Sequence, residues 1–190
     1  MKRLIATIAS VLTSLTLAAA DKEPTAFALI KEGNRYVGEQ AKDRVVQLRS
    51  ERSIGSLNPK VWYVVYHDPT ASMKAVEVKF AAGKMIDVKR PFRLIERVAD
   101  KTAPMDKDKL KIDSNKAIEI ALKEPILEDI KVKSVEASLQ NDGTIGPVWK
   151  LRLWAERLSG AQETAGIGHI VVTADEGKVI ENEVNLKRLD

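Results

Sequence analysis

A pattern that occurs twice constrains the fold of this chain more than any other feature. Residues 59–66 hold a Val-Trp pair that opens an alternating apolar run, and residues 147–153 do the same. Each run is followed downstream by a Gly-Lys turn and two apolar residues, at 83–86 and at 177–180. Self-similarity of this kind indicates a duplicated structural unit. We therefore predict two copies of one small α+β module.

Residues 1–20 have the composition of a secretory signal peptide. Two basic residues precede an apolar run over residues 4–17, and Ala18-Ala19-Ala20 offers a cleavage site. The run is short and rich in Ser and Thr, whereas a bilayer span needs about 20 apolar residues. An uncleaved membrane anchor is the alternative interpretation. We predict a periplasmic or secreted protein with no stable membrane span once the signal is removed.

Charge and cysteine content exclude several classes of function. The formal net charge is +4, and removal of Lys2 and Arg3 lowers it by two, to +2. Acidic and basic residues are interspersed, and no basic stripe with aromatic residues is present, so a nucleic-acid partner is not predicted. The chain has no cysteine, so it can form neither a disulfide nor a thiolate metal site, and core packing must hold it together.

Hydrophobic periodicity gives the same order of elements in both copies. The first copy has a predicted helix over residues 25–33 and predicted strands over 43–52, 61–66, 73–80 and 85–94. The second copy has a predicted helix that begins at Asp113 or Ser114 and ends before Pro125, then predicted strands over 130–139, 148–154, 167–173 and 178–189.

These elements predict an α+β fold of two repeated modules, each with one helix packed on a mostly antiparallel four-stranded sheet. The first module would cover residues 21–98 and the second 112–190. Between them, residues 99–111 are rich in Lys and Asp and include Pro104, so we interpret them as a linker.

The second copy resembles the PepSY domain family over residues 113–185. The positions that carry the resemblance are Ala117, Ile120, Ala121 and Leu122 in the helix, Val132, Val135 and Glu136 in the first strand, residues 148–153, and residues 169–180. The last run looks like the closing hairpin of the family. The first copy shares the Trp strand and the turn at 83–86, with Ala81 where the second copy has Asp175.

The resemblance implies an exported protein without a reaction of its own. PepSY-like domains occur in exported proteins, including propeptides of secreted metalloproteases, and the family is proposed to restrain proteases. A tandem pair of such units is also similar, at the level of fold alone, to the secreted β-lactamase inhibitor proteins. Likeness of fold does not carry activity.

The tryptophans are the strongest candidates for a binding role. Trp62 and Trp149 occupy the same position of the repeat, which favours a structural role for both, as do the turn glycines Gly83 and Gly177. Trp154 has no counterpart. Alternation places it on the side of Arg152, which we interpret as solvent-exposed, and Tyr63 lies on the corresponding side of the first copy. Trp154, Arg152 and Tyr63 are the predicted partner-binding residues, against the alternative of simple surface or inter-repeat packing.

No catalytic, cofactor-binding or metal-binding residue is predicted. His67 and His169, the two histidines, stand at different points of the repeat, so we interpret them as unrelated strand-end residues. Asp175 and Glu176 lie in a turn where nothing nearby would perturb them, as acid–base chemistry requires.

The prediction from sequence is a non-enzymatic PepSY-like protein that binds a macromolecular partner, either a protease or a cell-envelope protein. Two alternatives stay open. A small-ligand carrier that uses the concave sheet face would need an apolar cavity beneath a helix. An envelope hydrolase would need both histidines, or carboxylates from both copies, in one cleft.

Overall fold

The computed structural model describes residues 24–90, 103–157 and 163–190. The predicted signal peptide at 1–20 therefore lies outside the described residues. So do residues 91–98 of the predicted first module and residues 99–102 of the predicted linker.

The described residues form two α-helices, eight strands and three short 3-10 helices. The first half has α1 (Ala26–Gly33), β1 (Val45–Ser50), β2 (Val61–His67), β3 (Ala75–Ala81) and β4 (Lys84–Lys89). The second has α2 (Ser114–Ala121), β5 (Val132–Asn141), β6 (Pro147–Glu156), β7 (Thr164–Thr173) and β8 (Val179–Val184), with η1 (Lys107–Lys109), η2 (Pro125–Leu127) and η3 (Leu186–Leu189) outside the sheet.

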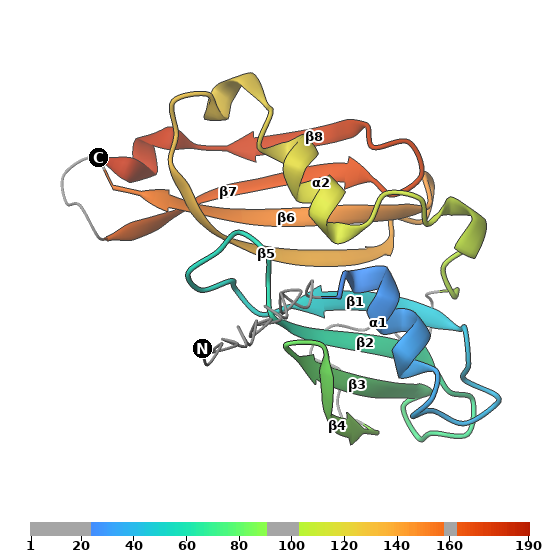
Figure 1. The fold of residues 1–190 in the computed structure, drawn as a ribbon. Coiled ribbons are helices and arrows are strands. Elements are labelled where there is room, and N and C mark those ends of the chain that lie inside the picture. Colours follow the sequence, from blue (N-terminus) through green and yellow to red (C-terminus); the bar gives the residue numbers. More distant parts are fainter. Residues whose placement is uncertain (1–23, 91–102, 158–162) are drawn as a thin grey trace, which may run out of the picture.

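All eight strands belong to one antiparallel sheet, in the order β4-β3-β2-β1-β5-β6-β7-β8 (Figure 1). The predicted fold class, two repeated modules each with its own four-stranded sheet, is therefore wrong. The first strands of the two halves pair with each other, and this pairing merges what alternation suggested were separate sheets. The sequence locates the strands because alternation is a local signal, whereas the β1–β5 pairing is not local. The predicted last strand over 178–189 is too long, because β8 ends at Val184 and residues 186–189 form η3.

The pairing of β1 with β5, which we call the seam, is short. Its ladder has three residue pairs, Gln47↔Gln140, Leu48↔Leu139 and Arg49↔Ser138. Beyond the ladder, buried serines continue the attachment. The Ser50 hydroxyl accepts the Ala137 N–H at 2.9 Å, and the Ser53 hydroxyl accepts the Val135 N–H at 2.9 Å.

Both helices cover the same face of the sheet (Figure 1), and one hydrophobic core lies beneath them. Trp149 is fully buried at its centre. Its ring stacks on Phe27 of α1, with centroids 6.1 Å apart, and meets Trp62 edge-on at 6.3 Å. The two repeated tryptophans are thus both in the core. The indole N–H of Trp62 donates to the carbonyl of Pro59, and that of Trp149 donates to the carbonyl of Ile112.

One carboxylate serves the N-termini of both helices. Asp113 is the N-cap of α2 and accepts the Ser114 N–H at 2.7 Å, and it also accepts the Phe27 N–H of α1 at 3.2 Å. Thr25, the N-cap of α1, makes no capping hydrogen bond with its own side chain. Asp113 therefore satisfies backbone donors that would otherwise lack partners at two helix ends.

The turn glycines fit their positions for steric reasons. Gly83 and Gly177 have φ of 77° and 74°, values that favour glycine. A Cβ on Gly83 would lie 2.5 Å from Pro24 Cγ, and one on Gly177 would lie 2.8 Å from Ile120 Cδ1. Each turn therefore packs closely against the helix-bearing side of the molecule.

The described end of the predicted linker lies against the sheet. Met105 is buried, and its N–H donates to the carbonyl of Val45 on β1 at 2.8 Å. Asp106 then caps η1. Among the described residues, no helix has the length and apolar character needed to cross a membrane.

Candidate functional site

The sheet face opposite the helices, which we call the outer face, carries the predicted partner-binding residues. Alternation from the buried positions of β2 and β6 places Tyr63, Arg152 and Trp154 on this face. Tyr63 and Trp154 are half-buried and Arg152 is exposed. Neither described helix covers this side of the sheet (Figure 1).

Tyr63 is held between two cations from neighbouring strands. The Arg49 guanidinium lies over its ring, 3.9 Å from the centroid, and the Lys79 ammonium lies 4.9 Å from it. The Tyr63 hydroxyl donates to Glu51 at 2.6 Å, and with Lys79 it holds the pKa of that carboxyl below its ordinary value. The phenol is thereby fixed in one orientation and keeps one edge toward solvent.

Trp154 lies in a similar setting on the other side of the seam. The Arg52 guanidinium covers its ring at 4.6 Å and is itself fixed by hydrogen bonds to Ser134 and Thr164. Beneath the ring, a Cβ on Gly166 would lie 3.2 Å from the indole nitrogen, so the glycine allows the indole to lie flat on the sheet. Tyr63 and Trp154 are thus two aromatic groups, each covered by an arginine from β1 or the residues just after it.

We call Arg49, Arg52, Tyr63, Arg152 and Trp154 the aromatic–arginine patch. Sequence reasoning identified three of its members but not Arg49 or Arg52. Arg49 lies opposite Tyr63 in the ladder. Arg52 follows β1 and contacts a tryptophan about one hundred residues away in sequence. Only the β1–β5 seam brings Arg52 there, and no local pattern shows that pairing.

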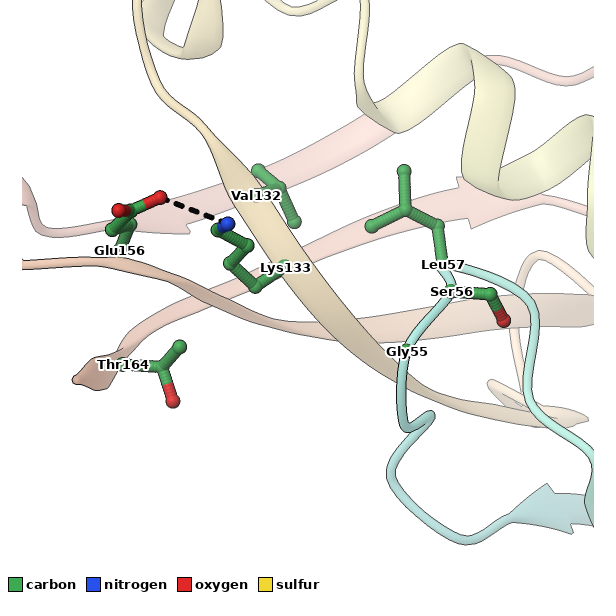
Figure 2. Close-up of a pocket in the computed structure, with 7 residues that line it drawn as sticks. All are labelled: Gly55, Ser56, Leu57, Val132, Lys133, Glu156 and Thr164. Atoms are coloured by element: carbon green, nitrogen blue, oxygen red, sulfur yellow. Dashed lines mark ion pairs between the residues drawn. The ribbon is translucent and has the colours of Figure 1, made fainter. Parts of the chain in front are cut away.

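A pocket of about 610 Å³ lies between residues 55–57 and the strands β5, β6 and β7 (Figure 2). Its lining residues are Gly55, Ser56, Leu57, Val132, Lys133, Glu156 and Thr164. Thr164 also accepts a hydrogen bond from Arg52, so the pocket and the patch share a wall. Lys133 and Glu156 form an ion pair of 2.9 Å in it, and Lys133 with Lys131 lowers the pKa of Glu156.

The two histidines are not in one cleft. His67 ends β2 and His169 lies on β7, with β1, β5 and β6 between the two strands. Burial, with Arg44 and Lys74 nearby, lowers the pKa of His67. A hydrolase site that needs both imidazoles together is therefore not formed.

The turn carboxylates do not resemble an acid–base pair. The Glu176 backbone N–H and the Thr173 hydroxyl hold the pKa of Asp175 below its ordinary value. A general acid near neutral pH needs the opposite shift.

Sequence reasoning also missed a cluster on β7 and β8. His169 lies opposite Glu183 in the ladder, and Glu181 is two residues away on the same face. The Glu-Asn-Glu spacing in a strand paired with a histidine-bearing strand is a signal that could have located it.

Comparison of the chain with family models, curated proteins and solved structures found no match. The PepSY resemblance therefore stays a prediction.

Proposed function

We propose that this is an exported protein without catalytic activity of its own and that it binds a protein partner through the aromatic–arginine patch. The observation that carries the proposal is the pairing of Tyr63 and Trp154 with arginines on the sheet face that neither described helix covers. Trp, Tyr and Arg are the residues that most often dominate the energy of protein interfaces. The partner class suggested by the PepSY resemblance is a protease or a cell-envelope protein.

Preorganisation supports a binding role for this face. The stacked and hydrogen-bonded partners of Tyr63 and Trp154 restrict their rotamers before any contact, so binding would cost less side-chain entropy. Arg52 makes no ion pair with a carboxylate among the described residues. Its charge is therefore available to an acidic group on a partner.

Capture experiments with matched variants test the proposal. The immobilised protein is exposed to periplasmic extract and culture medium at near-physiological salt, beside Trp154→Ala and Tyr63→Ala variants. Lys116→Ala on α2 is the control, because that exposed side chain lies on the opposite face. We expect a protein retained by the wild type and the control, with retention by the Trp154 variant reduced at least about tenfold.

Two outcomes would overturn the proposal. One is the recovery of no partner by the wild type. The other is equal retention by wild type and the Trp154 variant, with both shown to be folded by their unfolding transitions. If the partner is a protease, its residual activity in the complex distinguishes inhibition from simple docking.

Export is tested separately by mass spectrometry of the natural protein. We expect a mature N-terminus at Asp21, in the periplasm or the medium. An intact chain that begins at Met1 in the membrane fraction would contradict export by a cleaved signal and favour the uncleaved anchor.

The pocket beside the patch favours a second candidate, a small-ligand carrier. Its wall includes Leu57 and Val132, but also the Lys133–Glu156 ion pair. An apolar ligand would have to desolvate that pair, which costs several kcal/mol per ion. A small ligand with both charged and apolar groups would fit better, and its binding would be impaired by Glu156→Gln but not by Trp154→Ala.

A further inference from the structure

Three side chains with metal-ligating atoms meet at the β7–β8 edge of the outer face. The Nε2 atom of His169 lies 2.6 Å from Glu181 Oε1 and 3.7 Å from Glu183 Oε2. One ligating atom from each of the three residues lies within 4.8 Å of the others. They come from two adjacent strands, so the ladder that fixes the strands also fixes the cluster.

The cluster has more negative charge than one imidazole can balance. Within the described part of the chain, His169 is the only ion-pair partner of Glu181 and of Glu183. Arg152 is the cation opposite His169 on β6, and it is paired with Glu136 at 3.2 Å. Lys150, also on β6, faces Val171 rather than His169. One contact between the imidazole and a glutamate would balance the charge of one carboxylate only. The other carboxylate would then lie next to it with no cation to balance its charge.

We propose that His169, Glu181 and Glu183 bind a divalent first-row transition-metal cation. An imidazole nitrogen with two carboxylate oxygens suits Zn²⁺ and its neighbours better than Mg²⁺ or Ca²⁺, which take oxygen ligands. The carboxylates face solvent, with 46% and 67% of their side chains exposed, so water or a group from a partner can fill the remaining positions.

The spacing of the ligating atoms requires only a small adjustment. Ligand bonds of about 2.1 Å in a tetrahedral site place the ligating atoms about 3.4 Å apart. The observed separations straddle this value, and the exposed side chain of Glu183 can rotate to meet it. The imidazole is already fixed, because 14% of the His169 side chain is exposed and its strand is paired on both sides.

Gly168 is the positioning residue for the cluster. Its φ is 122°, and a Cβ there would lie 1.9 Å from the carbonyl oxygen of Glu183. Only glycine permits β8 to approach β7 this closely beside His169. The close approach holds Glu183 opposite the imidazole.

Titration of the metal-free protein with Zn²⁺ tests the site. We expect little Zn²⁺ binding at other positions, because the chain has two histidines and no cysteine. We expect one equivalent of Zn²⁺ to bind in calorimetry, with at least a tenfold loss of affinity in His169→Ala and in Glu183→Gln. Substitution of Co²⁺ should give a visible absorption band that His169→Ala abolishes.

Two matched variants serve as controls. His67→Ala removes the other histidine, and Glu136→Gln removes a carboxylate of the same face that is paired with Arg152. Both should bind Zn²⁺ as the wild type does. A dissociation constant on the order of 100 µM marks a weak site, so absence of binding at about that Zn²⁺ concentration would overturn the proposal. So would Zn²⁺ binding that His169→Ala leaves unchanged, with circular dichroism showing that the variant is folded.

Discussion

The two halves of the sheet have the same order of elements but differ in strand length and in surface chemistry. β1 to β4 have six or seven residues each, whereas β5, β6 and β7 have ten. The edge strand of the first half, β4, exposes Met85, Ile86 and Val88, whereas the edge strand of the second half, β8, exposes Glu181 and Glu183 beside a single large apolar residue, Ile180. A repeated order of elements therefore fixes neither the strand lengths nor the surface chemistry of each half.

The largest expected effect distinguishes the two repeated tryptophans. Trp149→Ala should lower the free energy of unfolding by about 3–5 kcal/mol, because the ring is fully buried and contacts both Phe27 and Trp62. Trp62→Ala should cost less, since that side chain also borders a pocket near the N-termini of the helices. Urea unfolding measures both. Equal losses would show that the halves share the core evenly.

The seam should be the next most sensitive region. Ser53→Ala removes the buried acceptor of the Val135 N–H and should cost about 1–3 kcal/mol, the penalty for an unsatisfied buried donor. Ser138→Ala, at a half-buried position of the seam ladder, is the control and should change stability by less than about 0.5 kcal/mol. A Ser53 variant as stable as the control would show that the halves need no polar attachment here.

The helix caps give a sharper comparison. Asp113→Ala should lower stability by about 1–2 kcal/mol, because this carboxylate accepts N–H groups from both helices. Thr25→Ala should have almost no effect, because the Thr25 side chain makes no capping bond. Thermal unfolding of the two variants measures the difference, and a larger loss for the Thr25 variant would contradict the shared cap.

A further prediction depends on pH and compares two carboxylates at strand ends. Burial would raise the pKa of Asp68, but hydrogen bonds from Thr70 and Gln40, together with Arg90, outweigh it and lower that pKa. A lowered pKa in the folded state contributes stability above the unfolded value of about 3.9, and that stability is lost as the pH falls through the folded value.

Asp68→Asn should therefore cost about 1–2 kcal/mol at pH 7 and progressively less below about pH 4. Glu156→Gln, at the more exposed end of β6, should show a weaker trend of the same sign. Unfolding free energies measured from pH 7 to pH 3 test this. A difference in unfolding free energy between the wild type and Asp68→Asn that grows as the pH falls would contradict the lowered pKa of Asp68.

Local signals in the sequence located the strands and the faces of their side chains. Alternation placed Trp149 inward and Trp154 outward, and glycine marked the turns at Gly83 and Gly177. The sheet order could not be predicted, because the β1–β5 pairing rests on three residue pairs and two buried serines with no recognisable pattern.

The residues of the candidate sites also differ in whether they could be identified from sequence. Tyr63, Arg152 and Trp154 were identifiable from alternation within one strand. Arg52 was not, because its contact with Trp154 depends on the seam. The cluster of His169 with Glu181 and Glu183 had a local signal in the Glu-Asn-Glu spacing, but its pairing with His169 depends on the contact between β7 and β8. Side-chain identity at one position does not show which residue lies opposite it.

The seam also has a consequence for the order of events in folding. Its serine hydrogen bonds join residues that are 82 and 87 positions apart in sequence, whereas the other strand pairs are neighbours along the chain. Closing a loop of that size costs entropy before the contacts form, and non-local pairing slows folding. We expect the hairpins to form first and the seam to close last, so that variants at Ser50 and Ser53 accelerate unfolding far more than they slow folding.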